Sequence, residues 1–246
     1  MTAIAIFGAT SAIAEQTART LAADGTRFFL VARQADKLSR IAADLAARGA
    51  GSVETEIYDF NDRAGLPALV EKAAARLYGI DMALIAFGTL TRQEEAMRDL
   101  AYAATELEVN FVSPTCLAQL LANHMAERGK GQLAVMTSVA GDRGRASNYI
   151  YGAAKGGLGI FLAGLRHRLV GQNVEVLDIR LGFVDTPMTK GFEKGPLWAK
   201  PDFVGRSIAQ AMRARRGGKL YVPWYWRWIM IVICHIPTPF FHRTRL

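Results

Sequence analysis

The sequence predicts an α/β fold in which a parallel β-sheet is covered by helices on both faces. Short runs rich in Ile, Val, Leu and Phe alternate with longer segments of helical pattern along the chain, which is typical of βαβ units. The short runs are apolar almost throughout, as expected of strands buried on both faces. Right-handed crossovers between them produce a doubly wound sheet. A chain of 246 residues without a linker or an internal repeat is compatible with one such domain.

Seven runs are strand candidates, and six longer segments are helix candidates. The predicted strands cover residues 3–7, 28–31, 52–57, 82–87, 132–137, 174–179 and 219–222. The predicted helices cover residues 12–23, 36–48, 66–77, 102–127, 149–170 and 202–214. Ligands of such sheets bind beyond the carboxyl ends of the strands. The residues that directly follow each strand are therefore the first candidates for a functional site.

A turn of small residues follows the first predicted strand. The sequence Gly8-Ala-Thr-Ser-Ala-Ile-Ala14 leads without a break into the first predicted helix. Free N–H groups and the dipole at a helix N-terminus favour an anion such as a pyrophosphate. Dinucleotide-binding turns usually carry glycines where this chain has Ala12 and Ala14, and the methyl group of Ala12 is acceptable only if its φ angle is negative. The alternative is that the small residues serve only the packing of the helix on the strand.

Arg33 directly follows the second predicted strand. An acidic residue at this place would bind the ribose hydroxyls of the adenosine, whereas an arginine can accommodate a 2′-phosphate. The sequence therefore predicts a preference for NADP, with NAD as the alternative cofactor. A solvated surface cation is the other interpretation of Arg33.

Three polar residues near the carboxyl edge of the sheet form a candidate catalytic centre. Tyr151 and Lys155 are four residues apart at the start of a predicted helix, so they share one helix face. A phenol has a pKa of about 10 in water, and a nearby ammonium lowers that pKa towards neutrality. Ser138 directly follows the fifth predicted strand and lies at the same edge. Because the serine and the turn accompany this pair, we favour a catalytic role over a surface tyrosine and a solvated lysine.

The ordered set of motifs resembles the short-chain dehydrogenase/reductase family. The set comprises the turn after the first strand, Asp59, Ala86-Phe-Gly88, Asn110, Ser138, Tyr151 with Lys155, and Arg180-Leu-Gly-Phe-Val-Asp-Thr186. It extends over about residues 3–222. The resemblance implies a Rossmann-like sheet of seven strands in the order 3-2-1-4-5-6-7. It also implies a nicotinamide-dependent enzyme that interconverts a ketone and a secondary alcohol and needs no metal.

The resemblance further implies a role for each matching residue. Tyr151 is expected to protonate the carbonyl oxygen, Lys155 to hold the nicotinamide ribose, and Ser138 to hydrogen-bond the substrate oxygen. Asn110 is expected to hold a water molecule next to the lysine. The expected cofactor contacts are Gly8, Thr10, Ser11, Ala12, Ile13, Arg33, Asp59, Phe60, Ala86, Phe87, Gly88, Tyr151, Lys155, Gly182, Val184 and Thr186.

The chain departs from the family pattern in three places. Ala12 and Ala14 stand where glycines are usual, Phe87 interrupts the usual Asn-Ala-Gly, and Leu181 replaces the proline before Gly182. None of these positions belongs to the four catalytic residues. We therefore expect the departures to affect cofactor affinity more than activity.

The net charge of +8 comes entirely from the end of the chain. Residues 203–246 contain eight Lys or Arg and no Asp or Glu, which leaves 22 basic and 22 acidic side chains in residues 1–202. The apolar run 220–234 is shorter than the ~20 residues of a spanning helix, and its Trp, Tyr and Arg content is typical of the membrane interface. The sequence therefore predicts a domain over residues 1–222 and an apolar, basic tail over 223–246. The tail docks on a membrane through residues 224–246 or packs against a neighbouring subunit.

The tail also resembles one subgroup of the family, the membrane-associated reductases of decaprenylphosphoryl-2-keto-erythro-pentose. This resemblance implies a lipid-linked keto sugar as substrate, whose phosphate could meet Arg143 and Arg145 in the loop after Ser138. One alternative is a soluble reductase of an acyl or small ketone whose tail serves oligomerisation. Another is a catalytically idle nucleotide-binding scaffold, which would usually lack the tyrosine or the lysine.

The remaining composition bears on location and partners. Cys116 and Cys234 match no metal-ligand spacing and no disulfide framework, which fits a reducing compartment. The first residues already read as a strand and not as a secretory signal. We therefore expect a cytoplasmic homo-oligomer, peripheral at the inner face of the cell membrane if the tail docks there. Nucleic acid is not an expected partner, because the excess positive charge lies in an apolar tail without a recognition motif.

Overall fold

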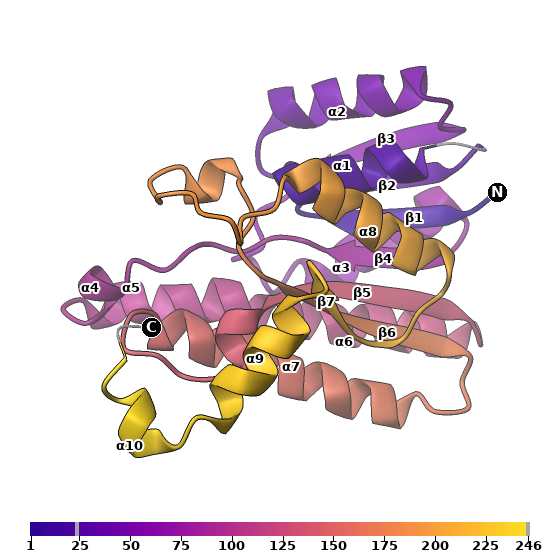
Figure 1. Cartoon of the computed structure of the whole chain (residues 1–246). Coiled ribbons are helices and arrows are strands. Elements are labelled where there is room, and N and C mark those ends of the chain that lie inside the picture. Colours follow the sequence, from indigo (N-terminus) through magenta and orange to yellow (C-terminus); the bar gives the residue numbers. More distant parts are fainter. Residues whose placement is uncertain (23–24, 245–246) are drawn as a thin grey trace.

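A computed structural model describes residues 1–22 and 25–244, and it is built on one seven-stranded sheet (Figure 1). The strands follow the order β3-β2-β1-β4-β5-β6-β7, and every neighbouring pair is parallel. The expected strand order is therefore confirmed. The strands are β1 (Ala3–Phe7), β2 (Arg27–Ala32), β3 (Ser52–Ile57), β4 (Met82–Ile85), β5 (Gly131–Ser138), β6 (Val174–Leu181) and β7 (Gly218–Val222). Strand β4 ends two residues before its predicted end.

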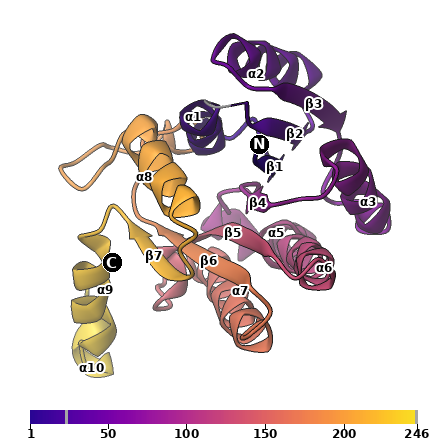
Figure 2. The ribbon, with the colours of Figure 1, turned by 90° about the vertical axis from the view of Figure 1, so that its right-hand side faces the viewer.

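Helices cover both faces of the sheet, as Figure 2 shows. One face carries α1 (Ala12–Leu21), α2 (Ala35–Ala47) and α8 (Pro201–Arg213). The opposite face carries α3 (Leu66–Leu77), α6 (Ser113–Glu127) and α7 (Tyr149–Arg168). The shorter helices α4 (Gln93–Ala96), α5 (Leu100–Leu107), α9 (Trp226–His235) and α10 (Thr238–Phe241) complete the structure. The first helix is predicted to extend to residue 23, which lies outside the described residues.

The sheet separates two hydrophobic cores, because successive side chains of a strand point to opposite faces. In β1, Ile4 and Ile6 belong to the core under α1, α2 and α8. Ala5 and Phe7 belong to the core under α3, α6 and α7. Burial on both faces explains why inner strands such as β1 and β4 are apolar throughout, whereas the edge strand β3 is partly exposed and contains Ser, Thr and Glu. Polar residues therefore gather beyond the carboxyl ends of the strands.

The predicted helix over residues 102–127 is interrupted. Helix α5 ends at Leu107, a π-helical turn follows over Glu108–Val112, and α6 begins at Ser113. Such single turns occur frequently at functional sites. Asn110 lies within this turn and is fully buried. The turn thus places a polar side chain inside the molecule at the end of the sheet.

The end of the chain folds back onto the domain. Trp226 and Met230 of α9 form a small apolar cluster with Val139, which follows β5. Arg143 donates hydrogen bonds to the carbonyl oxygens of Ile233 and Ile236, and its guanidinium carbon lies 3.7 Å from the centre of the Phe241 ring. Nη1 of Arg143 is therefore bonded to the tail, and the expectation that this residue meets a substrate phosphate stays a prediction. Among the described helices, none is long and apolar enough to cross a bilayer.

Candidate active site

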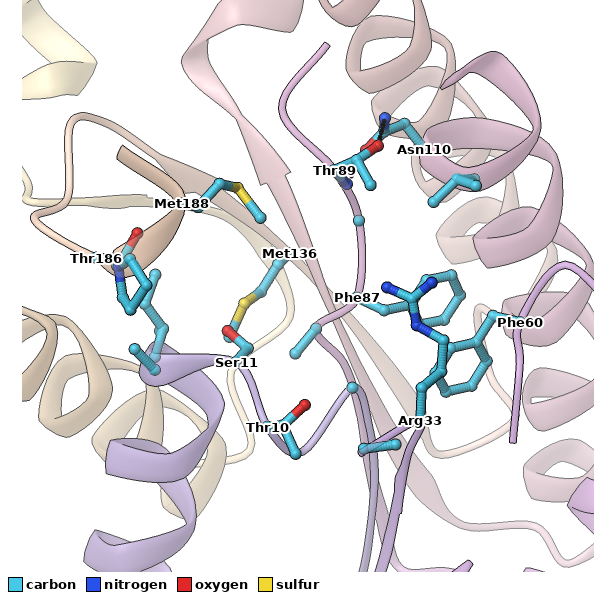
Figure 3. Close-up of a pocket in the computed structure, with 18 of the residues that line it drawn as sticks. Thr10, Ser11, Arg33, Phe60, Phe87, Thr89, Asn110, Met136, Thr186 and Met188 are labelled. Atoms are coloured by element: carbon cyan, nitrogen blue, oxygen red, sulfur yellow. Dashed lines mark hydrogen bonds between the residues drawn. The ribbon is translucent and has the colours of Figure 1, made fainter. Parts of the chain in front are cut away.

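A cleft of about 370 Å³ opens at the carboxyl ends of the strands (Figure 3). It is bounded by the turn between β1 and α1, the ends of β2 and β4, the π-helical turn, the start of α7 and the segment after β6. Fifteen residues predicted from the sequence line it, namely Gly8, Thr10, Ser11, Ala12, Ile13, Arg33, Asp59, Phe60, Ala86, Phe87, Gly88, Asn110, Tyr151, Lys155 and Thr186. The fold therefore brings together residues that are up to 178 positions apart in the sequence.

The other three predicted residues lie beside the cleft wall. Ser138 is the last residue of β5, and its Oγ accepts a hydrogen bond from the backbone N–H of Ala140 at 3.1 Å. The backbone N–H of Gly182 donates to the carbonyl oxygen of Val222 at 3.0 Å. Val184 is buried and pairs with Ala199 in an isolated bridge. Only Ser138 of these three is in hydrogen-bonding contact with Tyr151.

Several residues of the cleft wall were not among the predicted site residues. They are Ala32, Gln34, Lys37, Asn61, Thr89, Val109, Met136, Thr137, Leu181, Pro187 and Met188. Lys37 could have been found, because it lies one helical turn beyond Arg33 at the start of α2. Met188 lies in a short 3-10 turn over Pro187–Thr189 and Thr89 in an irregular segment, and the direction of neither side chain is encoded in a local pattern.

The turn between β1 and α1 has the geometry of an anion site. Gly8 has a φ angle of +88°, and a Cβ atom there would lie 2.6 Å from the backbone nitrogen of Phe87, so only glycine fits. Ala12 is the first residue of α1 and is not among the described residues with positive φ, so its methyl group is compatible with the turn. Ser11 is the N-cap residue, but its side chain caps no backbone N–H. The N–H groups of the first helical turn are therefore available to a pyrophosphate.

The cleft wall next to this turn is aromatic and basic. The rings of Phe60 and Phe87 stack in parallel with their centres 4.0 Å apart, so Phe87 packs against Phe60 where the family pattern has asparagine. Arg33 lines the same part of the cleft (Figure 3) and forms no ion pair with any described residue. Lys37 donates a hydrogen bond from Nζ to the carbonyl oxygen of Thr10 at 2.6 Å. Two cations thus lie where an additional phosphate on a dinucleotide would be attracted.

Tyr151 and Lys155 lie on the same face at the start of α7. The Nζ atom of Lys155 is 5.8 Å from the centre of the Tyr151 ring, and Lys155 is 4% exposed. Burial raises the pKa of Tyr151 to about 12, and a hydrogen bond with Ser138 acts in the opposite direction. Burial also lowers the pKa of Lys155 to about 8. The sequence predicts a lowered pKa for Tyr151, whereas in the structure burial is the largest influence and raises it. The phenol therefore keeps its proton at neutral pH, as a proton donor must.

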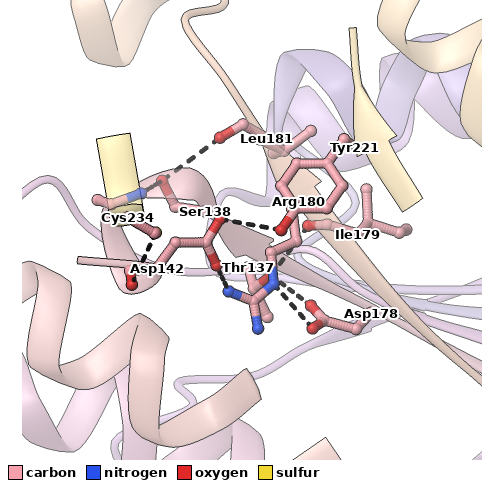
Figure 4. Close-up of polar contacts among 10 residues, drawn as sticks. Thr137, Ser138, Asp142, Asp178, Ile179, Arg180, Leu181, Tyr221 and Cys234 are labelled. Carbon is pink, nitrogen blue, oxygen red and sulfur yellow. Dashed lines mark hydrogen bonds and ion pairs between the residues drawn. The ribbon is translucent and has the colours of Figure 1, made fainter. Parts of the chain in front are cut away.

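The loop after Ser138 is held against α7. A Cβ atom on Gly141 would lie 2.5 Å from the backbone nitrogen of Gly156, so the loop and the helix approach each other at backbone distance. Below the loop, the buried guanidinium of Arg180 pairs with Asp142 and, at 3.0 Å, with Asp178 (Figure 4). These contacts fix the position of Ser138 relative to Tyr151.

Comparison with known proteins reveals similarity over most of the chain. The family described as short chain dehydrogenase matches residues 2–196. An uncharacterized oxidoreductase of Mycobacterium tuberculosis is 39% identical over 236 residues, which cover 95% of this chain and 93% of that protein. An uncharacterized oxidoreductase from the 5′ region of mprA in Streptomyces coelicolor is 32% identical over 239 residues, which cover 97% of this chain and 94% of that protein.

Two solved structures have the same fold. A variant of actinorhodin polyketide ketoreductase with NADPH superimposes with a TM-score of 0.79 at 22% identity, covering 90% of this chain and 95% of that one. An alcohol dehydrogenase from the archaeon Thermococcus sibiricus, complexed with 5-hydroxy-NADP, has a TM-score of 0.77 at 22% identity and covers 90% of this chain and 96% of that one. At this level of identity the two structures support the fold.

Proposed function

The chain belongs to the short-chain dehydrogenase family, and we propose that it reduces a ketone to a secondary alcohol with NADPH. The observation that carries this proposal is the arrangement at the start of α7. Tyr151, which is half-buried and retains its proton, contacts Ser138, and Lys155 lies on the same helix face beside a cleft with a dinucleotide-type turn. These groups are what carbonyl reduction requires.

Each catalytic group has a separate task in this proposal. When bound, NADPH would supply the hydride. Tyr151 donates its phenolic proton to the carbonyl oxygen as negative charge develops there, and Ser138 stabilises that charge by a hydrogen bond. The ammonium of Lys155 stabilises the phenolate that remains on Tyr151. Asn110, which is buried in the π-helical turn, binds a water molecule that connects Lys155 to the solvent.

A preference for NADPH over NADH is supported by the basic end of the cleft. Arg33 and Lys37 both line it, and guanidinium and ammonium groups bind a phosphate through charge-assisted hydrogen bonds. Asp59 lines the same cleft but belongs to the loop after β3, not to the end of β2 where an acid would select NADH. NADH is the alternative cofactor.

We propose a lipid-linked ketone, such as a keto sugar on a polyprenyl phosphate, as the substrate class. The support is the tail, which is rich in aromatic and aliphatic residues, contains three Arg and no Asp or Glu, and follows a segment, residues 203–222, with the other five cations of the positive excess. Its helix α9 exposes Trp228 and Val232, and Trp224 just before it is 69% exposed. An apolar face flanked by cations is suited to an anionic membrane surface, at the inner face of the cell membrane for a cytoplasmic enzyme. The alternative is that the substrate is a soluble ketone and that the tail is buried between subunits.

The test of the reaction uses the purified wild-type chain and Tyr151→Phe. Binding of NADPH is followed by its fluorescence, and turnover by NADPH oxidation with a panel of soluble and lipid-linked ketones. We expect both proteins to bind NADPH and only the wild type to oxidise it in the presence of a ketone. Failure of the wild type to bind NADPH, or equal turnover by the variant on a ketone, would contradict the proposal.

A further inference from the structure

Glu106 is a buried carboxylate next to the cleft for which the proposed mechanism has no use. It lies on α5 four residues before Asn110 and is 5% exposed. Its Oε2 atom accepts hydrogen bonds from the hydroxyls of Thr89 and Thr91, both at 2.8 Å. It also accepts from the Nδ2 atom of Asn110 at 3.4 Å. None of the ion pairs among the described residues includes Glu106, and its printed hydrogen bonds come from hydroxyl and amide donors.

These contacts fix the orientation of the Asn110 side chain. The hydroxyl of Thr89 donates its only hydrogen bond to Glu106. Towards Asn110 the hydroxyl oxygen can therefore only accept, and it accepts from Nδ2 at 2.9 Å. An ionised carboxylate also accepts only. The backbone N–H of Thr89 donates to Oδ1 of Asn110 at 3.1 Å. All three contacts therefore require the NH2 group of Asn110 to face Glu106 and the hydroxyl of Thr89, with its oxygen towards the backbone N–H of Thr89.

The oxygen of Asn110 faces the same space as the catalytic ammonium. A Cβ atom on Gly88 would lie 2.8 Å from Oδ1 of Asn110 and 3.2 Å from Nζ of Lys155. Both atoms therefore border one small volume on the side of Gly88 that lines the cleft. An amide oxygen accepts a hydrogen bond from an ammonium or from a water bound to it, whereas an amide NH2 group in its place would repel the ammonium.

We propose that Glu106 is a positioning residue, which holds Asn110 with its amide oxygen towards Lys155 and thereby supports the return of a proton to Tyr151. The inference rests on the proposed function, because it concerns the same proton donor. Glu106 touches neither the reacting atoms nor the cofactor turn. Loss of its carboxylate should therefore reduce kcat and leave the affinity for NADPH unchanged.

The matched substitutions are Glu106→Gln and Glu108→Gln. Glutamine keeps the size of the side chain, but its NH2 group can donate to Asn110, so the amide of Asn110 is no longer held in one orientation. Glu108 lies two residues further on and pairs with Arg63 at the surface, so Glu108→Gln removes the same charge without touching Asn110. We expect about a tenfold lower kcat for Glu106→Gln, an unchanged Kd for NADPH, and wild-type values for Glu108→Gln.

A double-mutant cycle separates positioning from a general loss of structure. If Glu106 acts through Asn110, Glu106→Gln should lower kcat in the wild-type background and have almost no further effect in Asn110→Ala. The inference would be overturned if Glu106→Gln lowered kcat by the same factor in the wild type and in Asn110→Ala. It would also be overturned if the Kd for NADPH rose by as much as kcat fell. Absence of ketone turnover in the wild type would instead contradict the proposed function.

A second readout needs no turnover. In protein labelled with ¹⁵N at asparagine, the side-chain amide signal that disappears in Asn110→Ala belongs to Asn110. Its two protons should exchange slowly with solvent in the wild type and in Glu108→Gln, and rapidly in Glu106→Gln. If the Asn110 amide protons exchange equally fast in the wild type and in Glu106→Gln, the carboxylate does not hold this side chain, whatever the enzyme does with ketones.

Discussion

Arg180 and Asp142 form an ion pair directly below the loop that follows Ser138, with 5% and 9% of their side chains exposed. The same guanidinium pairs with Asp178, whose carboxylate also accepts from the hydroxyl of Thr137. Burial lowers the pKa of Arg180 and raises the pKa of Asp178. The hydroxyl of Tyr221 on β7 donates to Asp142 at 3.1 Å (Figure 4). The network thus ties β5, β6 and β7 to the loop that positions Ser138.

Removal of the cation from this network should be strongly destabilising. Arg180→Met leaves two buried carboxylates without their ion-pair partner, and we expect the free energy of unfolding to fall by about 3–5 kcal/mol. Urea denaturation measures the change. The control is Arg206→Met, which breaks an exposed pair with Asp202 on α8 and should cost less than about 1 kcal/mol. Equal losses in the two variants would show that the buried network contributes no more than a surface pair.

Ketone reduction should depend on the charge of Lys155. Burial lowers the pKa of Lys155 to about 8, so its ammonium is complete below that pH and disappears as the pH rises through it. We expect kcat/KM for NADPH to be constant towards neutral pH and to fall above about pH 8, because this parameter reports groups of the free enzyme. If kcat/KM for NADPH stays constant up to about pH 10, Lys155 has an ordinary pKa and the prediction is wrong.

The same burial predicts that Lys155 lowers stability. Its pKa is about 8 in the folded chain and 10.5 in the reference state, so the folded state binds fewer protons between these values and stability rises with pH across that window. At neutral pH the full penalty of burying the ammonium is present, at most about 3 kcal/mol. Lys155→Met should therefore unfold at a higher urea concentration at pH 7 and lose this advantage near pH 10, while it no longer reduces ketones. A variant that is less stable than the wild type at pH 7 contradicts the account.

Arg33 should determine the choice of cofactor. Arg33→Asp removes a cation and adds an acid, so we expect the Kd for NADPH to rise about ten- to hundredfold, as for the loss of a charge-assisted hydrogen bond of about 1.5–3 kcal/mol. The Kd for NADH should stay the same or improve. Fluorescence titration with both cofactors measures the ratio. Arg40→Asp, an exposed change on α2 away from the cleft, is the control, and an unchanged ratio in Arg33→Asp would refute the assignment.

The exposed face of α9 should bind anionic bilayers. We expect the wild type to sediment with vesicles that contain phosphatidylglycerol, less so at high salt. The double variant Trp228→Ser/Val232→Ser should stay in solution. Its control is Ile160→Ser, which removes a large apolar side chain that is 77% exposed on α7. If the wild type does not sediment with any vesicles and is a dimer, whereas the double variant is a monomer, the tail is a subunit interface.

Much of the fold could be predicted from local patterns. Strands such as β1 and β5 are apolar runs bounded by turns, and parallel strands in a doubly wound sheet leave few arrangements. The candidate site could be predicted in part, because Arg33 directly follows β2 and Ser138 ends β5, so both lie at the carboxyl edge of the sheet.

The rest depends on contacts between distant residues. The basic side chain of Arg143 is equally compatible with a phosphate and with the carbonyls of α9, and its contact with those carbonyls is visible only in the folded tail. The pKa of Tyr151 depends on how deeply α7 is buried, which a spacing of four residues does not reveal. A buried role for Glu106 was not predicted, because a single glutamate in a helical pattern is typical of a surface.

The π-helical turn at Glu108–Val112 has a consequence for how the enzyme could be redesigned. A one-residue deletion in this turn would let α5 and α6 merge into a regular helix with its full set of backbone hydrogen bonds. Every side chain before the deletion would then rotate by roughly 100° relative to those after it. If the deleted residue lies between Glu106 and Asn110, their spacing falls from four residues to three, which changes the geometry of the contact between carboxylate and amide. A variant with this straightened helix is therefore expected to have higher thermal stability and a lower kcat.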